Sequence, residues 1–205
     1  MIVPRSSNGR TGGFDPPDGG SNPSRGTTLD PSPIVLVGEA PARDESRSHL
    51  DVVLALRSLG KFPPGGRVSL VRDATYLHRR APALLEFVAR TVHVNLLEEW
   101  PGPGRKGSGF PTGPAREAAR GAAIAWRSGE AVLRGGLLVG RPRLALLAGL
   151  RVAGAFGIRG VPYFEPLEAD FGRVAVVPHP SGVNLWLNRP ANRRALRRFL
   201  EDLAK

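Results

Sequence analysis

Four short apolar runs, separated by segments with helical spacing, constrain the fold of this chain more than any other feature. The runs cover residues 34–37, 92–97, 144–147 and 174–177. Continuous apolar runs of this length are typical of strands that are buried on both faces of a parallel sheet. Strands that alternate with helices favour such a sheet with helices on both sides. We therefore predict the α/β class, with a three-layer α/β/α sandwich around a four-stranded parallel sheet.

Helical spacing of apolar residues predicts five helices between and after these strands. They are expected over residues 44–59, 81–89, 115–133, 150–156 and 190–203. Residues 5–32 differ from these segments because they are rich in Gly, Pro, Ser, Asn and Arg and contain almost no apolar residues. Such a segment cannot bury enough surface to offset the entropy that ordering costs. We predict a disordered leader over residues 1–31 and one folded domain over residues 32–205.

Charge and composition narrow the possible partners. The chain carries 29 Lys and Arg against 18 Asp and Glu, which gives a formal net charge of +11. This balance indicates a nucleic-acid partner, with a solvated charged surface as the alternative interpretation. The absence of cysteine excludes disulfides, thiolate zinc sites and cysteine-ligated iron–sulfur clusters. No apolar run approaches the roughly 18 residues of a membrane span, and no signal peptide is visible. We expect a cytoplasmic monomer with no membrane partner, no metal and no cofactor.

Two loops rich in glycine and proline follow the first and the last of the expected strands. The first loop reads Gly38-Glu39-Ala40-Pro41, and the second reads His179-Pro180-Ser181-Gly182. Parallel strands end at the same edge of a sheet, and ligand sites form outside that edge. We therefore expect the two loops to line one site.

A third polar group belongs to the same edge. Asn95 lies in the second expected strand, where a buried amide needs partners for its oxygen and its NH₂ group. A core asparagine bonded to a neighbouring loop and a ligand-reading asparagine are both compatible with this position. For His179 a packing role is likewise the alternative to a functional one.

The two loops and Asn95 together resemble the uracil-DNA glycosylase superfamily, in particular its families with a Gly-Glu-Ala-Pro-Gly motif. The resemblance spans about residues 33 to 203. This chain departs from the pattern at Ala42, where those families have glycine, and it lacks their four iron–sulfur cysteines. Ala40 stands where the best-known enzymes carry a water-activating aspartate, so the aspartate mechanism does not carry over.

The resemblance implies a role for each matching residue. Gly38, Ala40 and Pro41 would surround a flipped base, and Asn95 would read its edge. His179 would donate a hydrogen bond to the base O2, and Glu39 would position water or order the loop. Contacts with DNA would come from Pro180, Ser181, Gly182 and Val183, with Val183 as a wedge in the duplex. The aromatic residue that stacks on the base stays open among Phe62, Trp100 and Phe110.

A basic face on the last expected helix completes the candidate site. Arg189, Arg193 and Arg197 recur every fourth residue. Such a face is either solvated or a track for DNA phosphates, and its place directly after the histidine loop favours the track.

The leading hypothesis is a DNA glycosylase that hydrolyses the N-glycosidic bond of uracil or a related damaged base by base flipping. A glycosylase for a modified pyrimidine or a deaminated purine keeps the fold and changes the base. A non-catalytic DNA- or nucleotide-binding member is suggested by Ala40 and Ala42. An unrelated α/β enzyme with a phosphate-binding glycine loop is a further alternative. The absence of a P-loop motif and of a clean GxGxxG motif argues against the nucleotide-binding versions.

Overall fold

The described part of the chain comprises most of the predicted domain. The computed structural model describes residues 34–41, 49–61, 68–102, 110, 112–128, 142–181 and 184–205. All of them belong to the unit Pro31–Lys205. The predicted leader over residues 1–31 lies outside the described residues.

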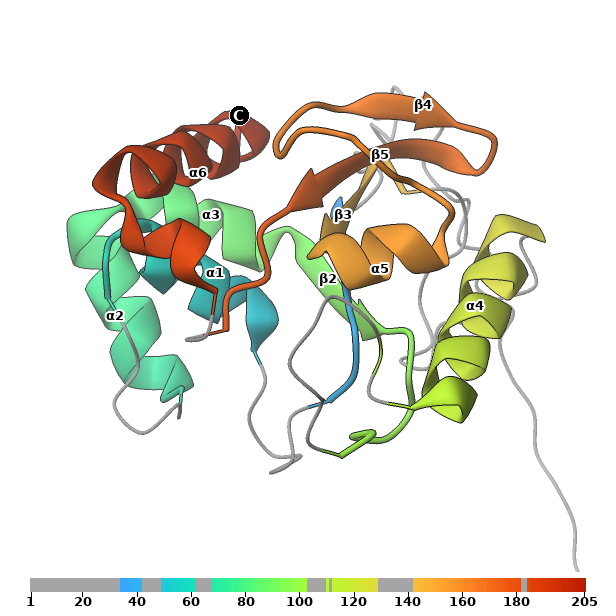
Figure 1. The fold of residues 1–205 in the computed structure, drawn as a ribbon. Helices are drawn as coiled ribbons and strands as arrows, with labels where there is room; N and C mark the ends of the chain where they lie inside the picture. Colours follow the sequence, from blue (N-terminus) through green and yellow to red (C-terminus); the bar gives the residue numbers. More distant parts are fainter. Residues whose placement is uncertain are drawn as a thin grey trace, which may run out of the picture. The chain divides into compact units, whose positions relative to one another are not determined.

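A five-stranded sheet forms the middle of this unit, with the strand order β2-β1-β3-β5-β4 (Figure 1). The strands are β1 (Ile34–Gly38), β2 (Thr91–Asn95), β3 (Leu144–Ala148), β4 (Leu167–Ala169) and β5 (Gly172–Val177). The four apolar runs form β1, β2, β3 and β5, and neighbours among these pair in parallel. The short β4 pairs antiparallel with β5. The predicted four-stranded, wholly parallel sheet is therefore wrong in strand number, and the sheet is mixed.

Helices pack on both faces of the sheet. On one face lie α1 (Leu50–Ser58), α2 (Leu70–Arg80), α3 (Pro82–Ala89) and α6 (Pro190–Leu203), together with the 3₁₀ turn η2 (Leu185–Asn188). On the other face lie α4 (Gly113–Ser128) and α5 (Leu150–Ala155) (Figure 1). The side chains of a strand alternate between these two layers, so Ile34 and Leu36 belong to one core and Val35 and Val37 to the other. This alternation explains why β1 and β3 are apolar and buried throughout.

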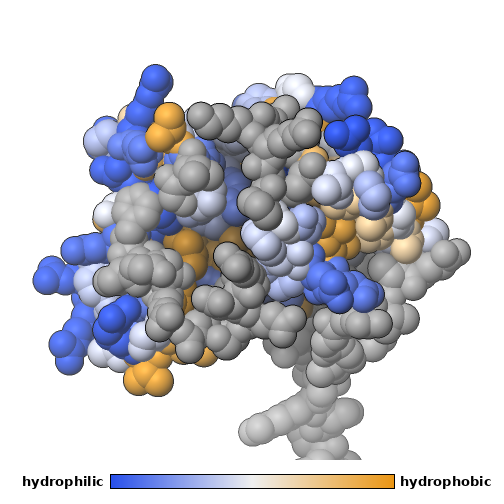
Figure 2. All heavy atoms as spheres, turned by 60° about the horizontal axis from the view of Figure 1, so that its bottom comes forward, coloured by the Kyte–Doolittle hydropathy of each residue, from blue (hydrophilic) through white to orange (hydrophobic). Residues whose placement is uncertain are grey.

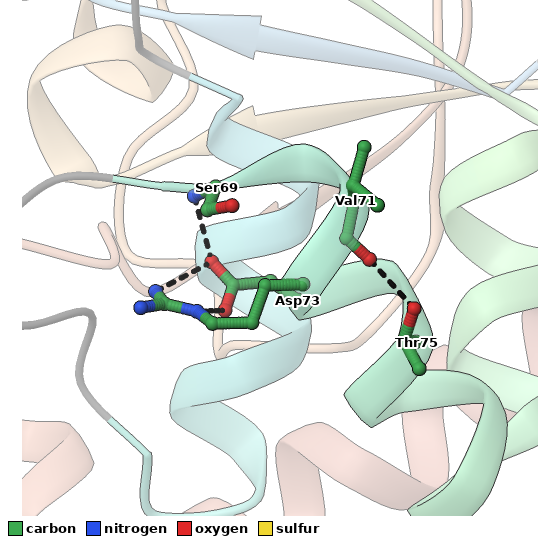
Figure 3. A network of polar contacts seen from close by, with 5 residues as sticks. Ser69, Val71, Asp73 and Thr75 are labelled. Atoms are coloured by element: carbon green, nitrogen blue, oxygen red, sulfur yellow. Dashed lines mark hydrogen bonds and ion pairs between the residues drawn. The ribbon is translucent and has the colours of Figure 1, made fainter.

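The helix α2 was absent from the sequence prediction. Its first turn is fixed by Asp73, whose carboxylate accepts hydrogen bonds from the Ser69 amide at 2.9 Å and from the Arg72 side chain at 3.0 Å. Figure 3 shows this contact beside the bond from the Thr75 hydroxyl to the Val71 carbonyl, one turn back. Leu77 is the only apolar side chain of α2 that is fully buried, and Leu70 and Val71 at its start are exposed.

None of the helices in the described ranges is long and apolar enough to cross a membrane.

The strand order places a switch point between β1 and β3. From β1 the chain crosses to β2 on one side, and it later enters β3 on the other side. The helices that follow β1 and β3 therefore lie on opposite faces of the sheet, and the carboxyl edge at such a switch point is where open α/β sheets bind ligands.

Candidate active site at the carboxyl edge of the sheet

Residues from four strand ends meet at this edge. The Gly38 and Asn95 Cα atoms are register partners, and the Leu96 and Leu97 amides bond to the carbonyls of Gly38 and Glu39 at 3.0 Å each. On the other side of β1, the Gly149 amide after β3 bonds to the Val177 carbonyl of β5 at 2.8 Å. These backbone bonds extend the sheet into its loops. Figure 2 brings this side of the molecule forward, and hydrophilic residues there border smaller apolar areas.

Gly38 is required by its contact with Asn95. A Cβ at position 38 would stand 2.4 Å from the Asn95 Oδ1 atom and 3.0 Å from the His93 Nε2 atom. The Asn95 Oδ1 atom is buried, and no donor among the described residues bonds to it. A buried acceptor without a donor costs free energy, so this oxygen is available to a donor on a bound molecule.

Gly149 makes room for His179. Its φ of 94° lies in the left-handed region, and a Cβ there would stand 3.0 Å from the His179 Cβ atom. The turn from β3 into α5 therefore passes directly beside the histidine that follows β5. Sequence analysis had not singled out this glycine.

The main chain selects the tautomer of His179. The Ser181 amide donates a hydrogen bond to the His179 Nδ1 atom at 3.2 Å. Nδ1 is thus an acceptor, and the proton of the neutral ring is on Nε2. Burial, followed by the positive charge of Arg151, lowers the pKa of His179 from 6.5 to about 4. At neutral pH the ring is uncharged and presents an Nε2–H donor.

Asn184 holds the loop that carries His179. Its side-chain amide donates to the His179 carbonyl at 2.8 Å, and its side-chain oxygen accepts from the Trp186 amide at 3.1 Å. The Arg57 guanidinium on α1 donates to the Asn184 carbonyl at 3.3 Å. Arg57 is only 1% exposed, and its burial lowers the pKa of its guanidinium. The histidine loop is thereby joined to both α1 and η2.

Glu39 faces Arg151, a residue that sequence analysis did not identify. The Arg151 Nη1 atom lies 3.1 Å and 3.3 Å from the two carboxylate oxygens. The Glu39 side chain is 17% exposed and the Arg151 side chain is 28% exposed, so this ion pair is largely shielded from solvent. Arg151 is part of no motif, because it lies in the first turn of α5 within an otherwise small and apolar segment. Only the pairing of β1 with β3 indicates that Arg151 lies near Glu39.

The structure places Gly38, Glu39, Asn95 and His179 at one edge of the sheet, where Gly38 contacts Asn95 and Glu39 pairs with Arg151. Ala40 and Pro41 are half-buried beside them, Pro180 is buried and Ser181 is half-buried. Gly182 and Val183 lie outside the described residues, so the predicted phosphate contact and wedge have no structural description.

Two arginines of the predicted basic face on α6 have partners within the protein. Arg193 donates to the carbonyls of Leu187 and Asn188 at 3.3 Å and 2.8 Å, so it fixes η2 against α6. Arg197 pairs with Glu201 on the next turn at 2.7 Å. Both guanidinium groups already have partners within the protein. Arg189 is exposed, and so is Arg194, which the prediction had not included among the contact residues.

The aromatic candidates differ in their surroundings. Phe110 is 7% exposed and belongs to the core beneath the α4–α5 face, so it is not free to stack on a ligand. Trp100 is 41% exposed after the end of β2. Phe62 lies outside the described residues.

No group of three or more His, Cys, Asp or Glu residues in the described ranges is arranged to hold a metal ion.

Comparisons with known proteins do not assign this chain to a family. No protein-family model matches the chain, and a search of curated proteins finds no similar one.

Proposed function

We propose that this protein is a DNA glycosylase that hydrolyses the N-glycosidic bond of uracil or a related damaged base. The observation that supports this most is the state of His179. A neutral imidazole, held with its Nε2–H group directed away from the Ser181 amide, is a preorganised hydrogen-bond donor. Such a donor suits a reaction in which negative charge develops on a leaving group.

In the proposed reaction, negative charge develops on an oxygen atom of the departing base. As the bond between C1′ and the base nitrogen breaks, its electron pair moves onto the base, and part of that charge reaches O2. Water then attacks C1′ and releases a proton. With a pKa of about 4, His179 is neutral at pH 7 and stabilises the charge by hydrogen bonding. One such donor contributes about 3–4 kcal/mol to the barrier.

Asn95 and the first loop would hold the base. The buried Asn95 oxygen next to Gly38 lacks a donor among the described residues, and the N3–H group of a uracil ring could supply one. Glu39 would position the attacking water or order the loop, since Ala40 leaves no carboxylate at the next position. Flipping the base costs a few kcal/mol and is cheapest at a mispair.

DNA is the proposed partner because of the charge of the whole chain and the exposed arginines near the histidine loop. The formal net charge is +11, and Arg189 and Arg194 are exposed at the start of α6. Arginine side chains at such positions neutralise phosphates without reading sequence.

A non-catalytic DNA-binding protein is the second candidate. The engagement of the Glu39 carboxylate by Arg151 favours it, because a carboxylate in an ion pair is less available to activate water. Both candidates predict DNA binding, and they differ in base release.

The test is a single-turnover assay with a duplex that contains one uracil, followed by alkaline cleavage of abasic sites. The wild type should release the base, and His179→Ala should slow the chemical step by roughly 10²–10³-fold. His78→Ala is the matched control, because His78 is exposed on α2. An equal rate for His179→Ala and wild type would reject the proposed role of His179. Binding without release of uracil, a modified pyrimidine or a deaminated purine would favour the second candidate.

A further inference from the structure

Arg151 connects two groups that arrive at the site from different strands. It lies in the first turn of the helix that follows β3, whereas Glu39 follows β1 and His179 follows β5. Its Nη1 atom contacts both oxygens of Glu39, at 3.1 Å and 3.3 Å. Two residues before it, Gly149 lies so close to His179 that a Cβ would meet the histidine Cβ at 3.0 Å. The Arg151 guanidinium thus reaches from the β3 side of the switch point to Glu39 on the β1 side.

We infer that Arg151 is a positioning residue of this site, which fixes the Glu39 carboxylate and places a positive charge beside the His179 ring. The inference deepens the proposed function and rests on it for the catalytic consequence. The two physical effects, on a carboxylate and on an imidazole, are properties of the folded protein and exist without any substrate.

Arg151 fixes the Glu39 carboxylate because that carboxylate is largely buried. The carboxylate is 17% exposed, so it has lost most of its hydration and needs a partner of opposite charge. Arginine supplies charge-assisted hydrogen bonds of fixed geometry. Without this contact, Glu39 would be free to adopt other rotamers, and its charge would act on the other groups of the site.

Burial is the largest cause of the lowered pKa of His179, and the charges around the ring add to it. Arg151 of α5 disfavours a second positive charge on the imidazole. Arg57 of α1 approaches the same loop through the Asn184 carbonyl. The Ser181 amide, which donates to Nδ1, also favours the neutral ring. Glu39, whose negative charge would favour the protonated ring, is instead engaged by Arg151.

Removal of the Arg151 guanidinium should therefore raise the pKa of His179, for two reasons. The repulsive positive charge disappears, and the Glu39 carboxylate is released from its ion pair. Both changes favour imidazolium, so the pKa of His179 should rise toward its ordinary value of 6.5. Burial of the ring is unchanged and keeps the new value below 6.5.

The test is an NMR titration of the histidine rings in the full-length protein, with the His179 signals assigned from a His179→Gln variant. Arg151→Gln should raise the pKa of His179 by up to about one unit, and Arg151→Lys should restore most of the difference. Arg159→Gln is the control, because it removes an equal charge from an exposed arginine shortly after α5. An unchanged His179 titration in a folded Arg151→Gln variant would overturn the inference.

A second readout applies to the reaction. If the protein releases a base, the acid limb of the single-turnover rate should move to higher pH in Arg151→Gln and return in Arg151→Lys. An acid limb that stays in place in Arg151→Gln would also overturn the inference. If the protein releases no base, the proposed function fails while the titration still decides the role of Arg151. A thermal melt of each variant separates loss of folding from both outcomes.

Discussion

The Asn95 side-chain oxygen lies against the Cα atom of Gly38, so closely that a Cβ at position 38 would stand 2.4 Å from it. The two residues are register partners at the ends of neighbouring parallel strands. The Asn95 amide can occupy this position only because the adjacent strand has no side chain at residue 38.

Gly38→Ala should destabilise the fold and move Asn95. The new methyl group must displace either the amide or the backbone of β1, which costs roughly 1–3 kcal/mol in a packed site. Chemical denaturation would measure the loss. Gly154→Ala in α5 is the control, since a Cβ there meets nothing within 4 Å, and alanine in a helix is neutral or stabilising by up to about 1 kcal/mol. Equal stabilities for the two variants would contradict the close contact.

The stability of the protein should depend on the state of His179 in weak acid. The pKa of the folded ring is about 4 and its ordinary value is 6.5, so between these values the unfolded chain binds the extra proton. Stability from this group is fully present above pH 6.5 and falls as the pH drops to about 4, by roughly 3 kcal/mol.

A difference measurement isolates this contribution. Burial raises the pKa of Asp51, so that group changes stability with pH in the opposite direction. The free energy of unfolding should therefore be compared between wild type and His179→Gln at pH 7 and pH 4.5. We expect the gap between the two proteins to shift against the wild type in acid. A gap that is independent of pH would show that the folded ring titrates normally.

Asn184→Ala should loosen the histidine loop. The variant loses the bonds to the His179 carbonyl and from the Trp186 amide, and it leaves both backbone groups without their partner. A loss of about 1–3 kcal/mol of stability is expected, with a slower chemical step if the proposed reaction is correct. Asn188→Ala, at an exposed position of η2, should change neither quantity. Hydrogen exchange of the Trp186 amide would report the loosening directly.

The arginines at α6 should separate into two groups in a salt titration of DNA binding. Arg189→Ala and Arg194→Ala should each lower the slope of log affinity against log salt by about one unit if the side chain contacts a phosphate. Arg193→Ala should leave the slope unchanged and lower stability by about 1–2 kcal/mol, because its two carbonyl contacts are lost. A fall in slope for Arg193→Ala alone would reverse this assignment.

The sequence was most informative where burial is complete. The apolar runs predicted β1, β2, β3 and β5 to within a few residues, and the last helix was predicted with its observed bounds, Pro190–Leu203. The strand β4 was missed because Leu167–Ala169 is too short and too exposed to give an apolar pattern. Helix α2 was missed although Leu70, Ala74 and Leu77 have helical spacing, and of its residues only Asp73 and Leu77 are buried.

The candidate site was predictable only in part, and the missing part depends on tertiary structure. The loop sequences indicated Gly38, Glu39 and His179, since each follows an apolar strand. Nothing local marks Arg151, which reaches Glu39 across 112 residues of sequence. The engagement of Arg193 was also hidden, because a basic stripe looks the same whether its members bind carbonyl groups or solvent.

The hydrogen bond from the Ser181 amide to His179 determines which substitutions position 181 can accept. A main-chain donor survives the replacement of its own side chain, so the hydroxyl group of residue 181 is not needed to select the ring tautomer. Proline is the one common replacement that removes this amide hydrogen. Position 181 can therefore vary among most residue types while the chemistry of position 179 is retained, and the serine itself is a poor marker for finding distant homologues.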